Sequence, residues 1–260
     1  MTHPALAPIR SVGRATLALL RALGQGAYLA AGAVRALRNT DIWAPHILTQ
    51  MYQIGVASVP IALFVAMFTG IVLALQASYT LTGGVPEYFV GTLVGKTMIL
   101  ELGPVLTGLA LAGRVGASIA AELGTMRVTE QIDALETLAY DPLAYLVVPR
   151  VAAGLLMFPV VIALAIAIGV VAGWATSISL LDMGSPQFVK GLKMFFDGFD
   201  VTFAMIKSVS FGLIVTGVGS FFGFHTVGGA EGVGRATTRA VVVSTMLILV
   251  LDAFWAVVLL

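Results

Sequence analysis

The stretch VAAGLLMFPVVIALAIAIGVVAGWATSISLL at residues 151–181 carries no charged side chain. A helix needs about 20 mostly apolar residues to cross the hydrocarbon core of a bilayer. A bilayer offers no water to backbone polar groups, so a single segment crosses it as a helix that bonds its own backbone. Residues 151–181 therefore predict a membrane-spanning helix.

Three further stretches have a similar composition, at residues 53–77, 201–224 and 240–260. A fourth, at residues 89–121, is apolar but contains charged residues. We count it as a span because residues 93–111 hold only two charges and are otherwise rich in Leu, Val, Ala and Gly. The sequence thus predicts an all-α integral membrane protein with five transmembrane helices.

The overall composition excludes several classes of protein. Of the residues, 59% are hydrophobic and 10% are charged, whereas a soluble domain carries about 25% charged residues. The net charge of +1 gives no basic surface for nucleic acid. The chain has no cysteine, and His3, His46 and His225 show no ligand spacing. We expect no metal site, and no serine–histidine pair within a span as an intramembrane hydrolase requires.

The distribution of basic residues predicts the orientation. The first 52 residues hold five arginines and one acid, Asp41, whereas residues 78–90 contain no Lys or Arg. The positive-inside rule then places the N-terminus in the cytoplasm. With five spans, we expect segment 122–150 in the cytoplasm and the C-terminus on the outer side of the membrane.

Residues 1–50 differ from the spans and are expected to form a basic amphipathic segment, with the transmembrane domain at 51–260. At about 100° per residue, the arginines of segment 10–38 fall within roughly 60° of one another: Arg10, Arg14, Arg21 and Arg35. A helix with one basic stripe and a wide apolar face is typical of the membrane interface. A disordered basic tail is the alternative, because three glycines weaken the helix.

The segment between spans two and three reads AELGTMRVTEQIDALETLAYDP at residues 121–142. Apolar residues recur there at helical spacing, which predicts a short amphipathic helix at 127–139. Its polar face carries Glu130, Asp133 and Glu136. Anionic leaflets favour basic residues, so this acidic helix suits docking on a protein. An ordinary solvated connector is the alternative.

Parts of this segment resemble a known family. The run ELGTMRVTEQIDAL at 122–135, continuing to Pro149-Arg150, is similar to the signature of the MlaE/YrbE permeases. Three other runs match as well: ELGP at 101–104, AGRVGAS at 112–118 and GRATTR at 234–239. The resemblance extends from about residue 50 to the C-terminus.

The resemblance implies that residues 127–139 form the coupling helix of an ABC transporter, inserted into a groove of a cytoplasmic ATPase. The residues to which it assigns this role are Glu122, Gly124, Arg127, Thr129, Glu130, Gln131, Asp133 and Leu135. The chain has no Gly-x-x-x-x-Gly-Lys-Ser/Thr motif with which to bind nucleotide phosphates. We therefore expect no catalytic residue and no cofactor here, with ATP and magnesium bound by the partner ATPase.

The resemblance also implies a set of partners and a task. It implies a homodimeric permease in the bacterial inner membrane with two ATPase subunits, a periplasmic MCE-domain protein and, in many systems, a STAS-domain subunit. The implied substrate is phospholipid, moved between the inner membrane and the MCE carrier to maintain outer-membrane lipid asymmetry.

Three charges lie deep within the predicted spans: Glu101, Lys207 and Asp252. At about 1.5 Å per residue, they lie roughly 10–15 Å from the outer ends of their spans. Charges at this depth are costly and mark function. One lysine between two carboxylates predicts a polar patch in a lipid-binding cavity open to the periplasm. A structural ion-pair latch is a compatible alternative.

The resemblance implies that this patch lines the substrate region, and that an arginine precedes the glutamate. Leu100 stands at that position here. A different class of function is an ion-coupled secondary transporter that uses Glu101, Lys207 and Asp252 as a relay. Internal repeats are typical of that class, and the two halves of this chain show no convincing repeat.

Span two contains further positions of interest. Lys96 lies about one turn inside the span and is expected to snorkel to the interface. Gly113 and Gly116 lie in a run of small residues that permits close helix approach, in packing or at a dimer surface. Gly103-Pro104 is expected to kink or weaken the helix and serve as a hinge.

Overall fold

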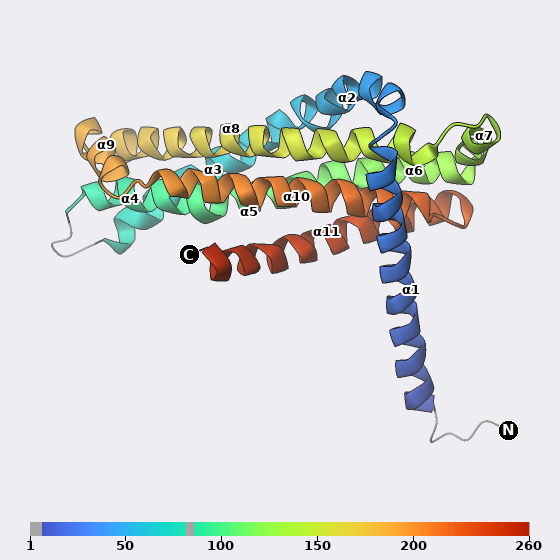
Figure 1. The fold of residues 1–260 in the computed structure, drawn as a ribbon. Coiled ribbons are helices and arrows are strands. Elements are labelled where there is room, and N and C mark those ends of the chain that lie inside the picture. The colour runs from blue at the N-terminus through green and yellow to red at the C-terminus, as the bar shows by residue number, and fades with distance from the viewer. Residues whose placement is uncertain (1–6, 82–85, 260) are drawn as a thin grey trace.

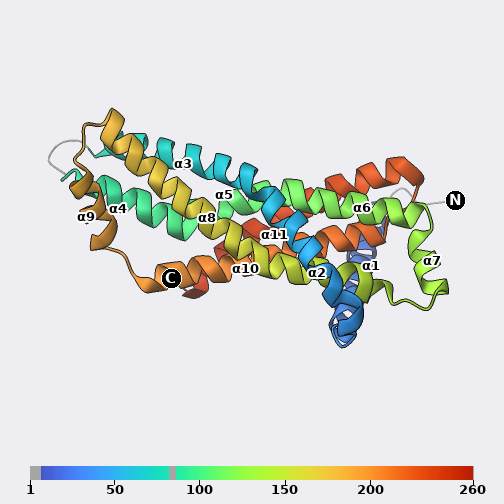
Figure 2. The same ribbon diagram turned by 90° about the horizontal axis from the view of Figure 1, so that it is seen from above.

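The computed structural model describes residues 7–81 and 86–259, and every regular element in these residues is a helix (Figure 1). Five helical stretches are long and apolar enough to cross a membrane: Thr40–Thr80, Tyr88–Val128, Leu143–Leu180, Gly198–Phe224 and Gly229–Leu259. The prediction of an all-α membrane protein with five spans is confirmed. Figure 2 shows these spans running along a common direction.

Span one begins earlier than its hydropathy predicted. It consists of α2 (Thr40–Ile54), the short 3₁₀ helix η2 (Val56–Ser58) and α3 (Val59–Thr80), whereas the sequence predicted 53–77. The chain bends at Gly55, between α2 and η2. This earlier start places His46 in a helix, edge-on to the ring of Tyr145 at a centroid distance of 4.6 Å.

Span two is a continuous helix with two π-helical interruptions. Its parts are α4 (Tyr88–Thr97), η3 (Met98–Leu102), α5 (Gly103–Leu111), η4 (Ala112–Gly116) and α6 (Ala117–Val128). The predicted weak point at Gly103-Pro104 directly follows η3. The N–H of Gly103 donates to the carbonyl of Met98, and a Cβ on Gly103 would lie 2.3 Å from that oxygen. Insertions of this kind gather at functional sites.

The remaining elements complete the bundle. After the turn that contains α7 (Gln131–Thr137) come η5 (Leu143–Val147) and α8 (Val148–Leu180), which form span three. Helix α9 (Ser185–Met194) lies at the opposite end of the bundle from α7 (Figure 1). Spans four and five are α10 (Gly198–Phe224) and α11 (Gly229–Leu259).

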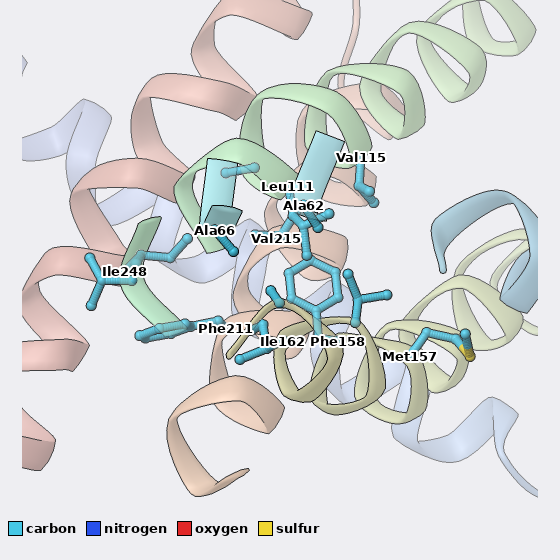
Figure 3. Close-up of a cluster of buried hydrophobic side chains, with 14 of the residues drawn as sticks. Ala62, Ala66, Leu111, Val115, Met157, Phe158, Ile162, Phe211, Val215 and Ile248 are labelled. Atoms are coloured by element: carbon cyan, nitrogen blue, oxygen red, sulfur yellow. The ribbon is translucent and has the colours of Figure 1, made fainter. Parts of the chain in front are cut away.

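Small residues allow the spans to pack with their backbones close together. A Cβ on Gly70 of α3 would lie 1.9 Å from the carbonyl oxygen of Gly169 of α8. Such contacts replace the hydrophobic drive that helices lack inside a bilayer. Around them lies the main core of buried side chains, to which Phe158 of α8 and Phe211 of α10 both contribute (Figure 3).

Helix α1 (Ala7–Ala36) stands apart from the bundle and runs across its direction (Figure 1). The sequence expected a helix at 10–38. Near its C-terminal end, Leu29 and Ala36 are buried, while Leu17, Leu20 and Tyr28 are exposed. The side chains of Arg10 and Arg14 lie outside the described residues, so their basic stripe and the interfacial position of α1 stay predictions.

Candidate functional site

The structure brings Glu101, Lys207 and Asp252 into contact inside the bundle. The Nζ atom of Lys207, on α10, lies 2.8 Å from Oε2 of Glu101 on η3. It lies 2.5 Å from Oδ1 of Asp252 on α11. It also donates to the carbonyl oxygen of Leu100 at 3.0 Å. We call the three charged residues the Lys207 cluster; it joins spans two, four and five.

Burial differs sharply within the Lys207 cluster. The Lys207 side chain is 0% exposed and that of Asp252 is 11% exposed, whereas that of Glu101 is 45% exposed. The ring of Phe203 lies 4.7 Å from Nζ and covers it further. The cluster therefore presents a carboxylate to its surroundings and encloses its cation.

The local sequence explains why the Leu100 carbonyl can accept a hydrogen bond from Lys207. Leu100 lies in the π-helical segment η3, just before α5, and an α-helical hydrogen bond to its carbonyl would come from the N–H four residues later, at position 104. Pro104 has no N–H, so the carbonyl is free to accept from Lys207. A second link between α10 and α11 runs from Nε1 of Trp255 to Oγ of Ser210 at 3.0 Å. Local sequence and packing together hold the ammonium group in place.

Lys96 has a partner that the sequence did not predict, and its position relative to the interface stays a prediction. Its Nζ forms an ion pair with Oδ2 of Asp200 at 2.7 Å, which ties α4 to the start of α10. The Lys96 side chain is 33% exposed and that of Asp200 is 7% exposed. We call these two residues the Lys96 pair. A buried acid within reach is a strong partner for the ammonium, and hydropathy did not predict this pair because Asp200 lies just before the predicted span at 201–224.

The predicted amphipathic helix at 127–139 is shorter in the structure. Helix α6 continues to Val128, and α7 spans only Gln131–Thr137. Between them, Glu130 adopts a left-handed conformation with φ of 59°. This turn breaks the helical run, so Arg127 belongs to span two. Arg127 still meets α7, through an ion pair with Asp133 at 2.5 Å.

Helix α7 is anchored by its apolar face. Ile132 is buried and Leu135 packs against the same core, while Leu138 is 69% exposed just after the helix. Glu130 and Asp133 are exposed, and the Gln131 side chain donates to Thr129 Oγ1 at 3.0 Å. The result is a short helix fixed to the end of the bundle with acidic and apolar groups facing outward.

The helices on either side of α7 are joined by a buried arginine that sequence reasoning missed. Arg150 is 3% exposed. Its guanidinium lies 3.0 Å from Glu122 and donates to the carbonyl of Leu146 at 2.6 Å. Close by along α6, a Cβ on Gly124 would lie 2.9 Å from Oγ1 of Thr226, so this glycine permits close packing. Glu122 and Gly124 thus act within span two.

The small residues of η4 divide into two kinds. A Cβ on Gly116 would meet Val215 at 3.4 Å, whereas one on Gly113 would meet nothing within 4 Å. Gly116 therefore packs inside the bundle and Gly113 faces outward. Between them, Arg114 donates to Ser58 Oγ at 2.5 Å, which fastens span two to the bend of span one.

Within residues 7–81 and 86–259, no group of three His, Asp or Glu side chains is placed to hold a metal ion. Among the described residues, the Lys207 cluster brings three charged side chains into contact inside the bundle, and its cation is supplied by the protein. This arrangement holds one ammonium and two carboxylates in fixed positions between three predicted membrane spans.

Comparison with known proteins agrees with this architecture. The family model of the MlaE permease matches residues 47–258. The chain is 38% identical to a probable ABC transporter permease protein of Rickettsia bellii, over 92% of this chain and 93% of the relative. It is 35% identical to the intermembrane phospholipid transport system permease protein MlaE of Haemophilus influenzae, over 94% of both chains.

A more distant relative is the chloroplastic protein TRIGALACTOSYLDIACYLGLYCEROL 1 of Arabidopsis thaliana, with 33% identity over 84% of this chain and 62% of the relative. The family match covers spans two to four in full, most of spans one and five, the Lys207 cluster and α7. The chain is therefore a member of the MlaE family of ABC transporter permeases.

Proposed function

We propose that this permease moves phospholipids between the bacterial inner membrane and a periplasmic MCE-domain carrier, and so maintains outer-membrane lipid asymmetry. The observation that carries the proposal is the Lys207 cluster. Ionised groups within a span are expensive and mark substrate paths, and here three of them meet with one carboxylate exposed. A relative named for intermembrane phospholipid transport supports the choice of substrate.

We propose α7 as the coupling helix on which a partner ATPase acts. Ile132 anchors it, and the Glu122–Arg150 pair ties together the two spans that flank it. A push on α7 would therefore reach spans two and three directly. The exposed Glu130, Asp133 and Leu138 supply the docking surface, on the cytoplasmic side. ATP and magnesium would be bound by the ATPase, and the permease itself would need no cofactor.

The remaining partners follow from the same proposal. The permease would work as a homodimer with two ATPase subunits, with the α9 end toward the periplasm and the MCE-domain protein. The N-terminus would be cytoplasmic and the C-terminus periplasmic. A STAS-domain subunit would join on the cytoplasmic side in systems that contain one.

An ion-coupled secondary transporter is the second candidate, because the Lys207 cluster joins three ionisable groups in direct contact. Such a relay would use a proton or ion gradient. The two candidates differ in their energy source. Transfer of phospholipid in vesicles that requires ATP and the ATPase supports the first; transfer driven by a proton gradient without any ATPase would replace it with the second.

The coupling role has its own test. Reversal of charge in Glu130→Lys with Asp133→Lys should uncouple ATP hydrolysis from lipid transfer and lower transfer at least about tenfold, the effect of about 1.4 kcal/mol. Asp41→Lys, at an exposed acid outside α7, is the matched control. Unchanged coupled transfer in the α7 variant would rule out docking through this acidic surface.

A further inference from the structure

We infer that the Lys207 cluster recognises the ammonium group of a lipid headgroup, and so favours aminophospholipid over lipid with a purely anionic headgroup. This inference rests on the proposed function and names the headgroup chemistry. The inference follows from the exposure of the charges: the carboxylate of Glu101 is accessible and the ammonium of Lys207 is not.

The ammonium of Lys207 is already engaged: it donates hydrogen bonds to the Leu100 carbonyl and to Glu101, and it forms an ion pair with Asp252. A lysine ammonium has three donors, and here Nζ is surrounded by three oxygens, from Leu100, Glu101 and Asp252. The ring of Phe203 covers it further, and the side chain is 0% exposed. A phosphate would reach Nζ only by displacing a carboxylate that is already in contact.

The accessible member of the cluster is an acid. The Glu101 side chain is 45% exposed and that of Asp252 is 11% exposed. One lysine and two carboxylates leave at most one net negative charge on the cluster. In the low dielectric of a bilayer, such a charge attracts an ammonium and repels a phosphate over several ångströms. The headgroup atom placed against Glu101 should therefore be a cationic nitrogen.

The residues next to Glu101 in the sequence provide no further cation that would cancel the negative charge of the Lys207 cluster. Leu100, next to Glu101, contributes only its carbonyl oxygen. Lys96, five residues earlier on the same span, is already paired with Asp200 at 2.7 Å. An ammonium that donates to a carboxylate adds attraction between opposite charges to the hydrogen bond, whereas the hydroxyls of a glycerol headgroup can donate but carry no positive charge.

The experiment is a competition in the complete transporter. Donor vesicles contain equal amounts of isotopically labelled phosphatidylethanolamine and phosphatidylglycerol, and ATP-dependent transfer of each is measured by mass spectrometry. A hydrogen bond between charged groups supports a preference of about tenfold for phosphatidylethanolamine. Glu101→Asp should keep the preference, and Glu101→Gln should bring the ratio close to one. Glu87→Gln, at an exposed acid before the same span, should leave the ratio unchanged.

The possible results distinguish a failure of headgroup recognition from a failure of the proposed lipid transport. Equal transfer of both lipids by the unaltered transporter, or preference for phosphatidylglycerol, would overturn the inference while leaving lipid transport intact. Preserved preference in Glu101→Gln would also overturn it. Absence of any ATP-dependent lipid transfer would instead contradict the proposed function. Where Glu101→Gln transfers no lipid, the ratio of the two lipids retained by the purified complex replaces the transfer ratio as the deciding measurement.

Discussion

The Lys96 pair and the Lys207 cluster connect the same two spans with opposite arrangements of charge. In the Lys96 pair, the cation lies on span two and is 33% exposed, while the acid on α10 is 7% exposed. In the Lys207 cluster, the cation lies on α10 and is 0% exposed, while the acid on span two is 45% exposed. The two sites are nearly mirror images in charge.

The two sites also differ in net charge and in the number of helices that they join. The Lys96 pair has one charge of each sign and joins two helices, which suits a fastening. The Lys207 cluster carries a second carboxylate, from α11, and joins three helices. The comparison teaches that a balanced pair holds helices together, whereas an unbalanced cluster with one exposed member has charge left over for a ligand.

The sharpest way to break this comparison is to exchange the charges at each site. Lys96→Asp with Asp200→Lys keeps a balanced pair, so transfer should stay within about threefold of normal, under 1 kcal/mol. Glu101→Lys with Lys207→Glu moves the exposed charge from negative to positive, so transfer should fall at least about a hundredfold. ATP-dependent lipid transfer in vesicles measures both. Similar losses in the two exchanges would show that the sites do not differ in function.

Removal of each cation should separate the two sites in stability. Lys207→Met leaves Asp252 buried without a partner, which should cost roughly 3–5 kcal/mol. Lys96→Met also leaves a buried acid, Asp200, but that carboxylate keeps the hydrogen bond from the backbone N–H of Asp197 at 3.1 Å, so this variant should cost less, about 1–3 kcal/mol. Thermal unfolding of the two purified variants in one detergent gives the order. A larger loss in Lys96→Met would reverse our assignment of the buried cation as the more costly one to remove.

The acid of the Lys96 pair offers a milder test. Asp200→Asn keeps a side chain that accepts the hydrogen bond from the backbone of Asp197, which Asp200 now receives at 3.1 Å. The variant should lose about 1 kcal/mol of stability and keep nearly normal transfer. A defect in transfer as deep as that of a Lys207 variant would move Asp200 into the functional site.

The smallest effect should come from Pro104→Ala. The alanine N–H would compete with Lys207 for the carbonyl of Leu100, which now accepts from Nζ at 3.0 Å. The loss of one hydrogen bond to a charged group, partly offset by a better helix, should change stability by about 1 kcal/mol or less. Equilibrium unfolding measures this change. Gly113→Ala, at a position in the same span where a Cβ meets nothing within 4 Å, is the control variant.

Hydropathy was enough to predict the five spans, and counting depth along them was enough to expect Glu101, Lys207 and Asp252 at one level. The ion-pair partners of Lys96 and Glu122 could not be predicted, because Asp200 and Arg150 lie just outside the predicted spans at 201–224 and 151–181. The π-helical segments carry no propensity signal of their own. Helical periodicity also gave no sign of the left-handed Glu130, since apolar spacing continues through the turn that separates α6 from α7.

The most direct test of the central claim is to locate the lipid headgroup by cross-linking. Phosphatidylethanolamine with a small photoreactive diazirine on a headgroup carbon, and with its primary amine left free, is added to the complete transporter in vesicles, and the labelled peptides are mapped. Ordinary bilayer lipids keep their headgroups at the interface, so label at membrane depth reports a bound cargo. The account predicts label on the peptides that contain Glu101 and Asp252, and its loss in the Glu101–Lys207 exchange variant. Label confined to the ends of the spans would contradict it.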